Sequence, residues 1–496
     1  MTDHGRAAAS APPAPPSARC GGAAAVKTGL EAAGFTSAGV RSALQADHEL
    51  LSQALELAVH ERRLAGASPR LATLIRLFVL DLPVDTAAAE EALAGIGVDR
   101  LAQLGLVAEE GATLRACVRV VPHDRLLIAS DRFGAAGAEY VAGVHRPSAT
   151  LGNLTVRRRV GSALDVRTGS GIQALLAAEH CARVVATDLN ERALAFAEFN
   201  AALNGRANVE FRAGSFFEPA HGERFELVVC NPPYVISPES SLVFRDSGLP
   251  GDTVSAELVA ALPAHLADDG FGTIMISWIA GDDPTARPRT WLDASGCDAW
   301  LLHTATEDPL GAAAAWARAA GTEPGDNVAE RLDSWVDYYA SLGIAAIAYG
   351  AVVMHRRSGD NWVRTAELPP NRLKPASAHL QQLFAAQSLL RGEPADALLD
   401  RRFALVEHAF LDRTQRVEGG RWALTSTAVR LEAGIGFRVN LDAAGTALVS
   451  ALDGAAPMRD VLPELAAQLG LPESELAVLA AQFLEHLVER GFAMPA

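Results

Sequence analysis

Four short apolar segments between residues 162 and 230 each end in, or are directly followed by, a polar residue or a glycine. This pattern constrains the fold more than any other feature of the chain. The segments cover residues 162–165, 182–188, 208–213 and 225–230. Helix-forming stretches separate the first three. Strands that alternate with helices predict a parallel sheet flanked by helices, and the ends of such strands meet at the edge where open α/β sheets bind ligands.

The first segment continues into a glycine-rich turn, Asp165-Val-Arg-Thr168-Gly169-Ser170-Gly171, and then into a helix. Gly169 and Gly171 allow the backbone to approach a ligand closely, and the start of the helix offers free N–H groups. The second segment ends in Asp188, 17 positions after Gly171, close to the spacing at which βαβ folds place a carboxylate on ribose hydroxyls. Together the two features predict a site for a ribose-containing cofactor.

The fourth segment is followed by Asn231-Pro232-Pro233-Tyr234. Two adjacent prolines remove two backbone N–H donors and stiffen the turn, so the Asn231 side chain and the following carbonyls are left as hydrogen-bond acceptors. Acceptors without donors suit a planar NH₂ group. A simple strand-ending Pro-Pro turn remains the alternative interpretation.

These motifs occur in the order found in class I S-adenosylmethionine-dependent methyltransferases. Asp165–Gly171, Asp188-Leu189-Asn190, Gly214–Pro219 and Asn231–Tyr234 resemble in particular the HemK/PrmC-like protein glutamine N5-methyltransferases. The resemblance covers roughly residues 140–290 and implies a Rossmann-like mixed sheet. It also implies that the glycine-rich loop holds the methionine part of S-adenosylmethionine, Asp188 the ribose, and Ser215 with Phe216 the adenine.

Two residue sets follow from the resemblance, and neither includes a metal ligand. The expected cofactor-binding residues are Asp165, Thr168, Gly169, Ser170, Gly171, Asp188, Leu189, Asn190, Ser215, Phe216 and Asn231, and the expected catalytic residues are Asn231, Pro232, Pro233 and Tyr234. Arg167 stands where glycine is commonest in the subgroup, and Ser215 where aspartate is usual, so each weakens the assignment at its own position. A dinucleotide-binding dehydrogenase shares the first two motifs, but the third glycine of its fingerprint is missing here.

The acceptor tetrapeptide suits transfer of a methyl group to a weakly nucleophilic nitrogen. In an amide or aryl amine the nitrogen lone pair is delocalised. If Asn231 Oδ1 and the Pro232 carbonyl each accept one N–H, they aim that lone pair at the methyl group. Tyr234 is expected to pack on the planar substrate. No general base is demanded, since the proton can leave after the methyl group arrives.

Our leading hypothesis is methylation of a glutamine side-chain amide in a protein or peptide. The first alternative is N-methylation of an exocyclic amine of RNA or DNA, which is also planar and conjugated. The second is an inactive adaptor that binds cofactor or peptide. A net charge of −16 repels nucleic acid at long range and favours the protein substrate. The sequence leaves the oligomeric state open.

Five cysteines without CxxC spacing favour a reducing cytoplasm and disfavour structural zinc. No membrane partner is expected, because the apolar run 344–354 is too short for a bilayer and is expected to form a central or near-central strand. The segment 235–251 is expected to be a long active-site loop, in which Arg245 and Asp246 form a solvated surface ion pair, with contact to the substrate as the alternative.

The chain is long enough for about three domains. We expect a disordered Ala/Pro-rich tail over 1–24, a small helical N-terminal domain over 25–115, the α/β methyltransferase domain over 116–365 and an α+β winged-helix-like module over 366–496. The last module resembles PqqD-like peptide-binding domains, with packing or dimerisation as the alternative role. Alternating apolar residues around Pro122-His123 predict a hairpin, and the segment 146–150 is expected to lie near the cofactor.

Overall fold

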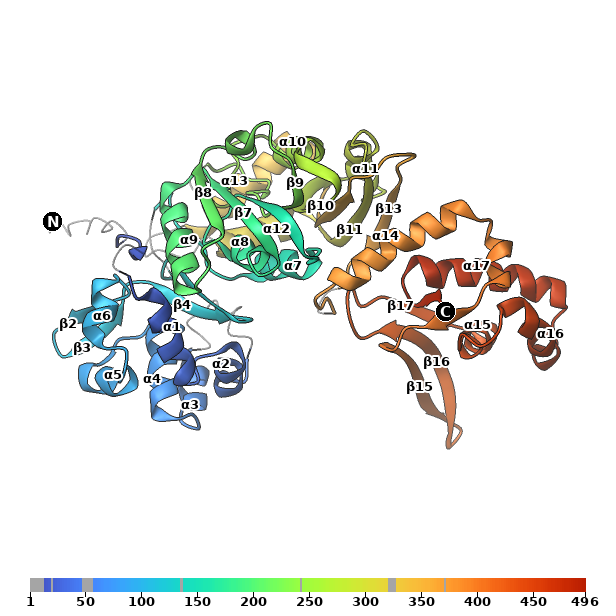
Figure 1. Ribbon diagram of the computed structural model, residues 1–496, viewed down its shortest axis with the longest axis horizontal. Coiled ribbons are helices and arrows are strands. Elements are labelled where there is room, and N and C mark those ends of the chain that lie inside the picture. Colours follow the sequence, from blue (N-terminus) through green and yellow to red (C-terminus); the bar gives the residue numbers. More distant parts are fainter. Residues whose placement is uncertain are drawn as a thin grey trace. The chain divides into compact units, whose positions relative to one another are not determined.

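A computed structural model describes residues 13–18, 21–46, 57–133, 137–240, 243–319, 327–369 and 372–496. The chain forms two compact units (Figure 1). The first unit consists of residues 1–152 and 159–365, and the second of residues 153–158 and 366–496. Among the described residues, no helix combines the length and the apolar character that a bilayer span requires.

An eight-stranded sheet with the order β13-β11-β12-β10-β9-β6-β7-β8 dominates the first unit. Its strands are β6 (Val160–Val166), β7 (Cys181–Asp188), β8 (Val209–Ala213), β9 (Phe225–Cys230), β10 (Leu266–Ala280), β11 (Asp298–Glu307), β12 (Ala346–His355) and β13 (Val363–Glu367). The neighbours from β10 to β8 pair in parallel, whereas β12 pairs antiparallel with both β10 and β11. The structure confirms the expected mixed α/β sheet, and the apolar run 344–354 supplies an interior strand.

Helices pack around this sheet (Figure 1) and bury most of β7 and β9, whereas no residue of the edge strand β8 is fully buried. They are α7 (Arg146–Leu154), α8 (Ile172–Ala177), α9 (Glu191–Leu203), α10 (Thr253–Ala261), α11 (Ala286–Asp293), α12 (Pro309–Ala319) and α13 (Val328–Ser341), with the 3₁₀ turns η3 (Glu218–Ala220) and η4 (Leu262–His265). Burial on both faces explains why strands such as β9 are continuous apolar runs and not alternating ones. The hairpin α12–α13 is inserted between β11 and β12.

The N-terminal part contains more β-structure than the expected helical domain. Its elements are α1 (Ala23–Ala32), α2 (Ser37–Leu44), α3 (Leu57–Leu64), α4 (Pro69–Phe78), β1 (Val84–Asp85), α5 (Thr86–Ala92), α6 (Val98–Gln103), β2 (Val107–Glu110), β3 (Thr113–Ala116), β4 (Arg119–His123) and β5 (Leu126–Ser130). Strands β1, β3 and β2 form a three-stranded sheet, and β4 pairs with β5 in the expected hairpin. Its turn lies at Asp124-Arg125, because Pro122 and His123 belong to β4 and pair with Leu127 and Leu126. Strands of two to four residues are too short to show a period of two in the sequence.

The expected tail over 1–24 is only partly described, because residues 1–12 and 19–20 lie outside the described residues. The Pro13 carbonyl accepts a hydrogen bond from Arg192 (2.7 Å), and the Ser17 N–H donates to the Leu104 carbonyl (3.1 Å). For residues 13–18 the structure therefore differs from the expected disorder: this segment packs on the first unit.

The second unit has the strand and helices expected of a winged-helix-like module and an additional long hairpin. Its elements are α14 (Ser377–Gly392), η5 (Ala395–Asp400), β14 (Phe403–Leu405), β15 (Ala409–Glu418), β16 (Arg421–Leu431), β17 (Arg438–Leu441), α15 (Ala443–Ser450), α16 (Met458–Leu469), α17 (Glu473–Glu489) and β18 (Ala493–Pro495). The hairpin β15–β16 continues into β17 as one sheet (Figure 1). Strand β14 pairs with β18.

A buried carboxyl group closes the turn between β6 and α8. Oδ2 of Asp165 accepts hydrogen bonds from the Thr168 hydroxyl (2.6 Å) and the Ala174 N–H (2.9 Å). Burial raises the pKa of Asp165 to about 7, although these two hydrogen bonds act in the opposite direction. The side chain therefore holds the glycine-rich turn in shape from inside the fold.

The variant Asp165→Asn is expected to alter how stability depends on pH. The unfolded chain loses this proton near pH ~4, whereas the folded chain keeps it until about pH 7. The free energy of unfolding of the wild type therefore falls as pH rises through this interval. Asparagine offers one oxygen to both donors and cannot ionise. We therefore expect the free energy of unfolding of the variant, relative to that of the wild type, to rise by up to about 4 kcal/mol between about pH 4 and about pH 8.

Urea unfolding across this pH range measures the effect. Asp124→Asn, at the exposed turn between β4 and β5, is the control for loss of one negative charge. A difference between Asp165→Asn and the wild type that does not change with pH would contradict the prediction.

Candidate active site

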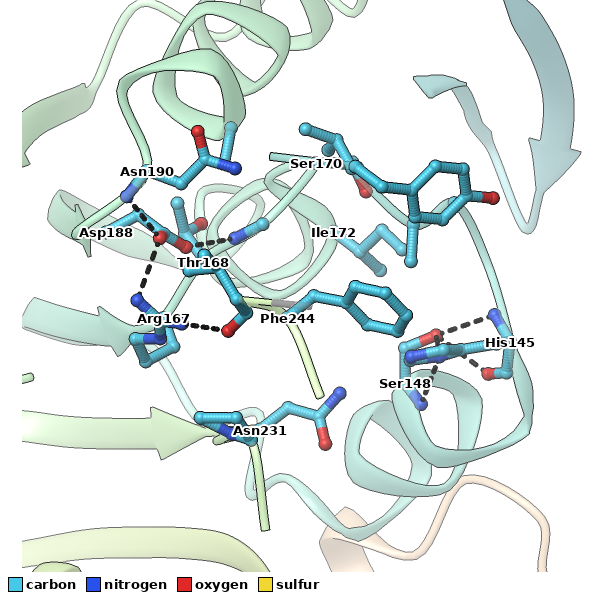
Figure 2. A pocket seen from close by; sticks show the side chains of 18 of the residues that line it. His145, Ser148, Arg167, Thr168, Ser170, Ile172, Asp188, Asn190, Asn231 and Phe244 are labelled. Carbon is cyan, nitrogen blue, oxygen red and sulfur yellow. Dashed lines mark hydrogen bonds and ion pairs between the residues drawn. The ribbon is translucent and has the colours of Figure 1, made fainter. Parts of the chain in front are cut away.

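A pocket lies where β6, β7 and β9 end (Figure 2). Its walls come from the segment before α7, from the glycine-rich loop, from the ends of β7 and β9, and from the loop after β9. The lining residues are Tyr140, Val141, Ala142, Gly143, His145, Ser148, Arg167, Thr168, Gly169, Ser170, Ile172, Gln173, Asp188, Asn190, Ala193, Asn231, Pro233, Val243 and Phe244. The predicted residues Thr168, Gly169, Ser170, Asp188, Asn190, Asn231 and Pro233 are thus brought together at one edge of the sheet.

The two glycines of the loop differ in what they contact. Gly169 has φ of +56°, and no atom lies within 4 Å of the position that a Cβ would occupy, so its open side can face a ligand. Gly171 has φ of +87°, and a Cβ there would lie 3.0 Å from Cβ of Ala197 on α9. Gly171 therefore permits close packing of the loop against α9 and does not line the pocket.

The Asp188 carboxylate is fixed at the end of β7. Its Oδ2 accepts the Gly169 N–H (2.9 Å), and its Oδ1 accepts the Asn190 N–H (2.9 Å). Asn190 in turn caps α9, because its Oδ1 accepts the Arg192 N–H (2.9 Å). The carboxylate is thus held at the rim of the pocket by the loop on one side and by the start of α9 on the other.

Arg167 connects this carboxylate to the loop after β9. Its Nη1 lies 3.2 Å from Oδ1 of Asp188, and its Nη2 donates to the Val243 carbonyl (2.6 Å), as Figure 2 shows. The backbone of Arg167 has φ of +63°, a left-handed conformation that costs a non-glycine residue about 1 kcal/mol or more. The residue noted in the sequence as a departure therefore occupies a strained position inside the site.

Asn231 presents an unpaired acceptor. Its Oδ1 is buried and has no hydrogen-bond partner among the described residues, and Figure 2 shows the side chain extending into the pocket. The Pro232 carbonyl accepts the Tyr234 N–H (2.8 Å), and the Ser277 hydroxyl donates to the Tyr234 carbonyl. These bonds clamp the tetrapeptide turn, so the Asn231 amide is presented by a rigid support.

The loop after β9 is anchored by a buried ionic network, which corrects the expected solvated ion pair. The Arg245 side chain is only 3% exposed and pairs with both Asp246 and Glu239. Glu239 also accepts the Trp335 indole N–H (3.0 Å), and the Tyr339 hydroxyl donates to the Ile236 carbonyl (3.0 Å). Helix α13 therefore holds the described part of the loop, and residues 241–242 lie outside the described residues.

Several predicted site residues lie outside this pocket, namely Asp165, Gly171, Leu189, Ser215, Phe216, Pro232 and Tyr234. Leu189 is 57% exposed, and burial raises the pKa of the Tyr234 hydroxyl above its ordinary value, with a smaller contribution from Tyr349. The Phe216 carbonyl accepts the Thr187 hydroxyl (3.0 Å), and its ring lies 5.7 Å from the Arg167 guanidinium.

The wall opposite Asp188 was largely missed from the sequence. It includes Tyr140, His145 and Ser148, which precede or begin α7, and Phe244 from the loop. The sequence offered one signal for it, the Arg-Pro segment 146–150, which was expected to lie near the cofactor. Residues 140–143 carry no sequence motif. Their place in the pocket wall depends on how the chain passes from the hairpin β4–β5 to α7, which no local pattern indicates.

Comparison with known proteins bears on the same region. A methyltransferase small domain matches residues 147–271, and two domains of unknown function, DUF7059 and DUF7782, match residues 32–117 and 381–495. The release factor glutamine methyltransferase of Xylella fastidiosa (strain Temecula1) is 37% identical over 161 residues, which are 29% of this chain and 54% of that protein. The ribosomal protein uL3 glutamine methyltransferase of Bradyrhizobium diazoefficiens is 34% identical over 162 residues, which are 30% of this chain and 48% of that protein.

The chain thus spans about half the length of the curated relatives it matches. Among solved structures, the YcgJ protein from Bacillus covers 43% of this chain and 99% of its own at 12% identity, with a TM-score of 0.30, which adds nothing to the topology described above. The family match and the two relatives bear out the resemblance drawn from the motifs: residues 147–271 match a methyltransferase small domain, and this part of the chain is similar to glutamine methyltransferases.

Proposed function

We propose that the protein is an S-adenosylmethionine-dependent methyltransferase that methylates a glutamine side-chain amide in a protein or peptide. The observation that carries this proposal is the buried, unpaired Oδ1 of Asn231 in the pocket that also contains Asp188 and Gly169. An unpaired buried acceptor costs about 1–3 kcal/mol unless a ligand supplies a donor. The relatives, which are glutamine methyltransferases of a release factor and of ribosomal protein uL3, support the amide as that donor.

The pocket suits the cofactor at Asp188 and at Gly169. Asp188 offers a rigid carboxylate to ribose hydroxyls, and Gly169 leaves its open side to a ligand. When bound, S-adenosylmethionine supplies an electrophilic methyl group on a positively charged sulfur. The methyl acceptor then has to lie on the Asn231 side of the pocket.

The chain's own contribution to the reaction is to orient the acceptor nitrogen. Asn231 Oδ1 accepts one N–H of the amide. The Pro232 carbonyl, which already accepts the Tyr234 N–H, has a second lone pair for the other N–H. Two fixed acceptors set the plane of the NH₂ group and so aim the nitrogen lone pair out of the amide plane.

The charge of the chain favours a protein substrate over a nucleic acid. A net charge of −16 opposes the approach of a polyanion at long range. We also propose that the protein acts in the cytoplasm, where release factors and ribosomal proteins are found. Methylation of an exocyclic base amine and an inactive adaptor remain the alternatives, and the next experiment separates them.

The variant Asn231→Ala is expected to lose methyl transfer by about 100-fold or more, because it removes a preorganised acceptor, while it still binds S-adenosylmethionine. Transfer of radiolabelled methyl groups into a lysate measures activity, with samples treated by protease or by nuclease, and calorimetry measures cofactor binding. Label that disappears only with protease is expected. Full activity of the variant would contradict the proposal, and so would label that disappears only with nuclease. If the wild type bound the cofactor but transferred no methyl group, the protein would be an adaptor.

The variant Arg167→Gly is expected to bind S-adenosylmethionine more tightly, by about tenfold at most. Arg167 occupies Oδ1 of Asp188, which ribose hydroxyls need, and glycine also relieves the left-handed backbone. Arg159→Gly removes one exposed positive charge just before β6 and is the matched control. Calorimetry decides: weaker binding by Arg167→Gly would show that the guanidinium supports the cofactor and does not compete with it.

A further inference from the structure

The ring of His145 is held in one orientation by Ser148, at the start of α7. The His145 N–H donates to Ser148 Oγ (3.0 Å), and this hydroxyl donates to the His145 carbonyl (2.7 Å). In return, the Ser148 N–H donates to Nδ1 of His145 (3.2 Å). Nδ1 also lies 2.9 Å from Ser148 Oγ, a contact whose donor depends on the tautomer of the ring. Because Nδ1 accepts the Ser148 N–H, we assign the proton of the neutral imidazole to Nε2.

Two further observations describe the state of this ring. Burial lowers the pKa of His145, which keeps the imidazole neutral near pH ~7. Among the described residues, none forms a hydrogen bond with Nε2. His145 lines the pocket, and Figure 2 shows its ring beside Ser148 at the pocket wall. The Nε2–H is therefore a donor available to a ligand.

This donor lies on the side of the glycine-rich loop. The side-chain amide of Gln173 donates to the Ser148 carbonyl (2.7 Å), which joins the first turn of α7 to the first turn of α8. Helix α8 begins directly after Gly171. His145 is thus tied to the part of the loop that, by the family resemblance, receives the methionine part of the cofactor, whereas Asp188 and Arg167 form the ribose side.

The methionine part carries a carboxylate, and the pocket offers it little positive charge. Among the described lining residues, Arg167 is the one with a cationic side chain, and it already pairs with Asp188. A carboxylate at the other end of the pocket therefore needs neutral N–H donors. An N–H that is fixed in place by a helix cap loses little conformational freedom when it binds.

We propose that the Nε2–H of His145 donates a hydrogen bond to the α-carboxylate of the methionine part of S-adenosylmethionine. This inference rests on the proposed function, since it assumes that the pocket binds this cofactor. It assigns His145 a role in binding the amino-acid part alone, separate from the adenosine part that Asp188 holds.

Two substitutions separate the capping role of His145 from its donor role. In His145→Asn, the side-chain oxygen takes the place of Nδ1 and caps α7, since asparagine is a favoured N-cap residue, but the donor at Nε2 is lost. In His145→Gln, the longer amide places an NH₂ group near the position of Nε2 and loses the cap. If the donor matters, the asparagine variant has the defect in binding, and if the cap matters, the glutamine variant has it.

The test is calorimetric titration of the full chain with S-adenosylmethionine and with 5′-methylthioadenosine, which has the adenosine and sulfur but lacks the amino-acid part. We expect His145→Asn to bind S-adenosylmethionine about tenfold more weakly, the effect of losing one hydrogen bond to a charged group. We expect its affinity for methylthioadenosine to stay within about twofold of the wild type, and His145→Gln to bind S-adenosylmethionine nearly as well as the wild type.

Other outcomes would overturn the inference. Unchanged binding of S-adenosylmethionine by His145→Asn would do so, even if methyl transfer fell, because the donor would then serve the methyl acceptor. An equal loss for both ligands would reveal a general effect on the fold of the pocket. If the wild type bound neither ligand, the proposed function itself would fail, an outcome distinct from a variant that binds like the wild type.

Discussion

The Asp188 carboxylate is the interaction on which the arrangement of the pocket depends. Its two oxygens accept N–H groups from Gly169 and from Asn190, so a single side chain positions both the glycine-rich loop and the start of α9. Through Arg167 it is also linked to the Val243 carbonyl of the loop after β9. A ligand that contacts this carboxylate therefore acts on three segments that are far apart in the sequence.

Helix α9 extends this connection to the N-terminal part of the first unit. The side-chain amide of Asn200 exchanges hydrogen bonds with the backbone of Ala129 on β5 (2.8 and 2.9 Å) and also donates to the Ser170 carbonyl (2.8 Å). One turn later, Asn204 makes the same pair of bonds with Leu127 (3.0 and 2.8 Å). Asn200 and the C-cap residue Asn204 thus pair with an edge strand as a neighbouring strand would. Asn200 also joins the hairpin β4–β5 to the glycine-rich loop.

The sequence revealed those parts of the site that depend on local patterns. The strands, Gly169, Asp188 and Asn231 could be predicted because period, spacing and turn chemistry determine them over a few residues. For Asp165 and Gly171, the sequence could not distinguish ligand binding from a role inside the fold. That role depends on a contact with a residue further along the chain: Asp165 accepts the Ala174 N–H, and Gly171 packs against Ala197. The burial of Arg245 depends on Trp335, which no local pattern connects to it.

The unpaired Asn231 acceptor explains why the surrounding turn has to be rigid. A flexible turn would let the amide rotate to meet water or a backbone donor, and its free energy would fall without a substrate. Pairing of Cys230 in the sheet holds the chain before the prolines, and the bonds from Ser277 to Tyr234 and from Tyr339 to Ile236 hold the chain after them. The free-energy cost of the unpaired Asn231 oxygen therefore persists until a hydrogen-bond donor binds. A ligand that lacks an N–H does not remove this cost. Sites built around a fixed hydrogen-bonding group reject ligands without the matching group more strongly than ligands of slightly different size, so the function proposed above gives the Asn231 turn a part in selecting an NH₂ group.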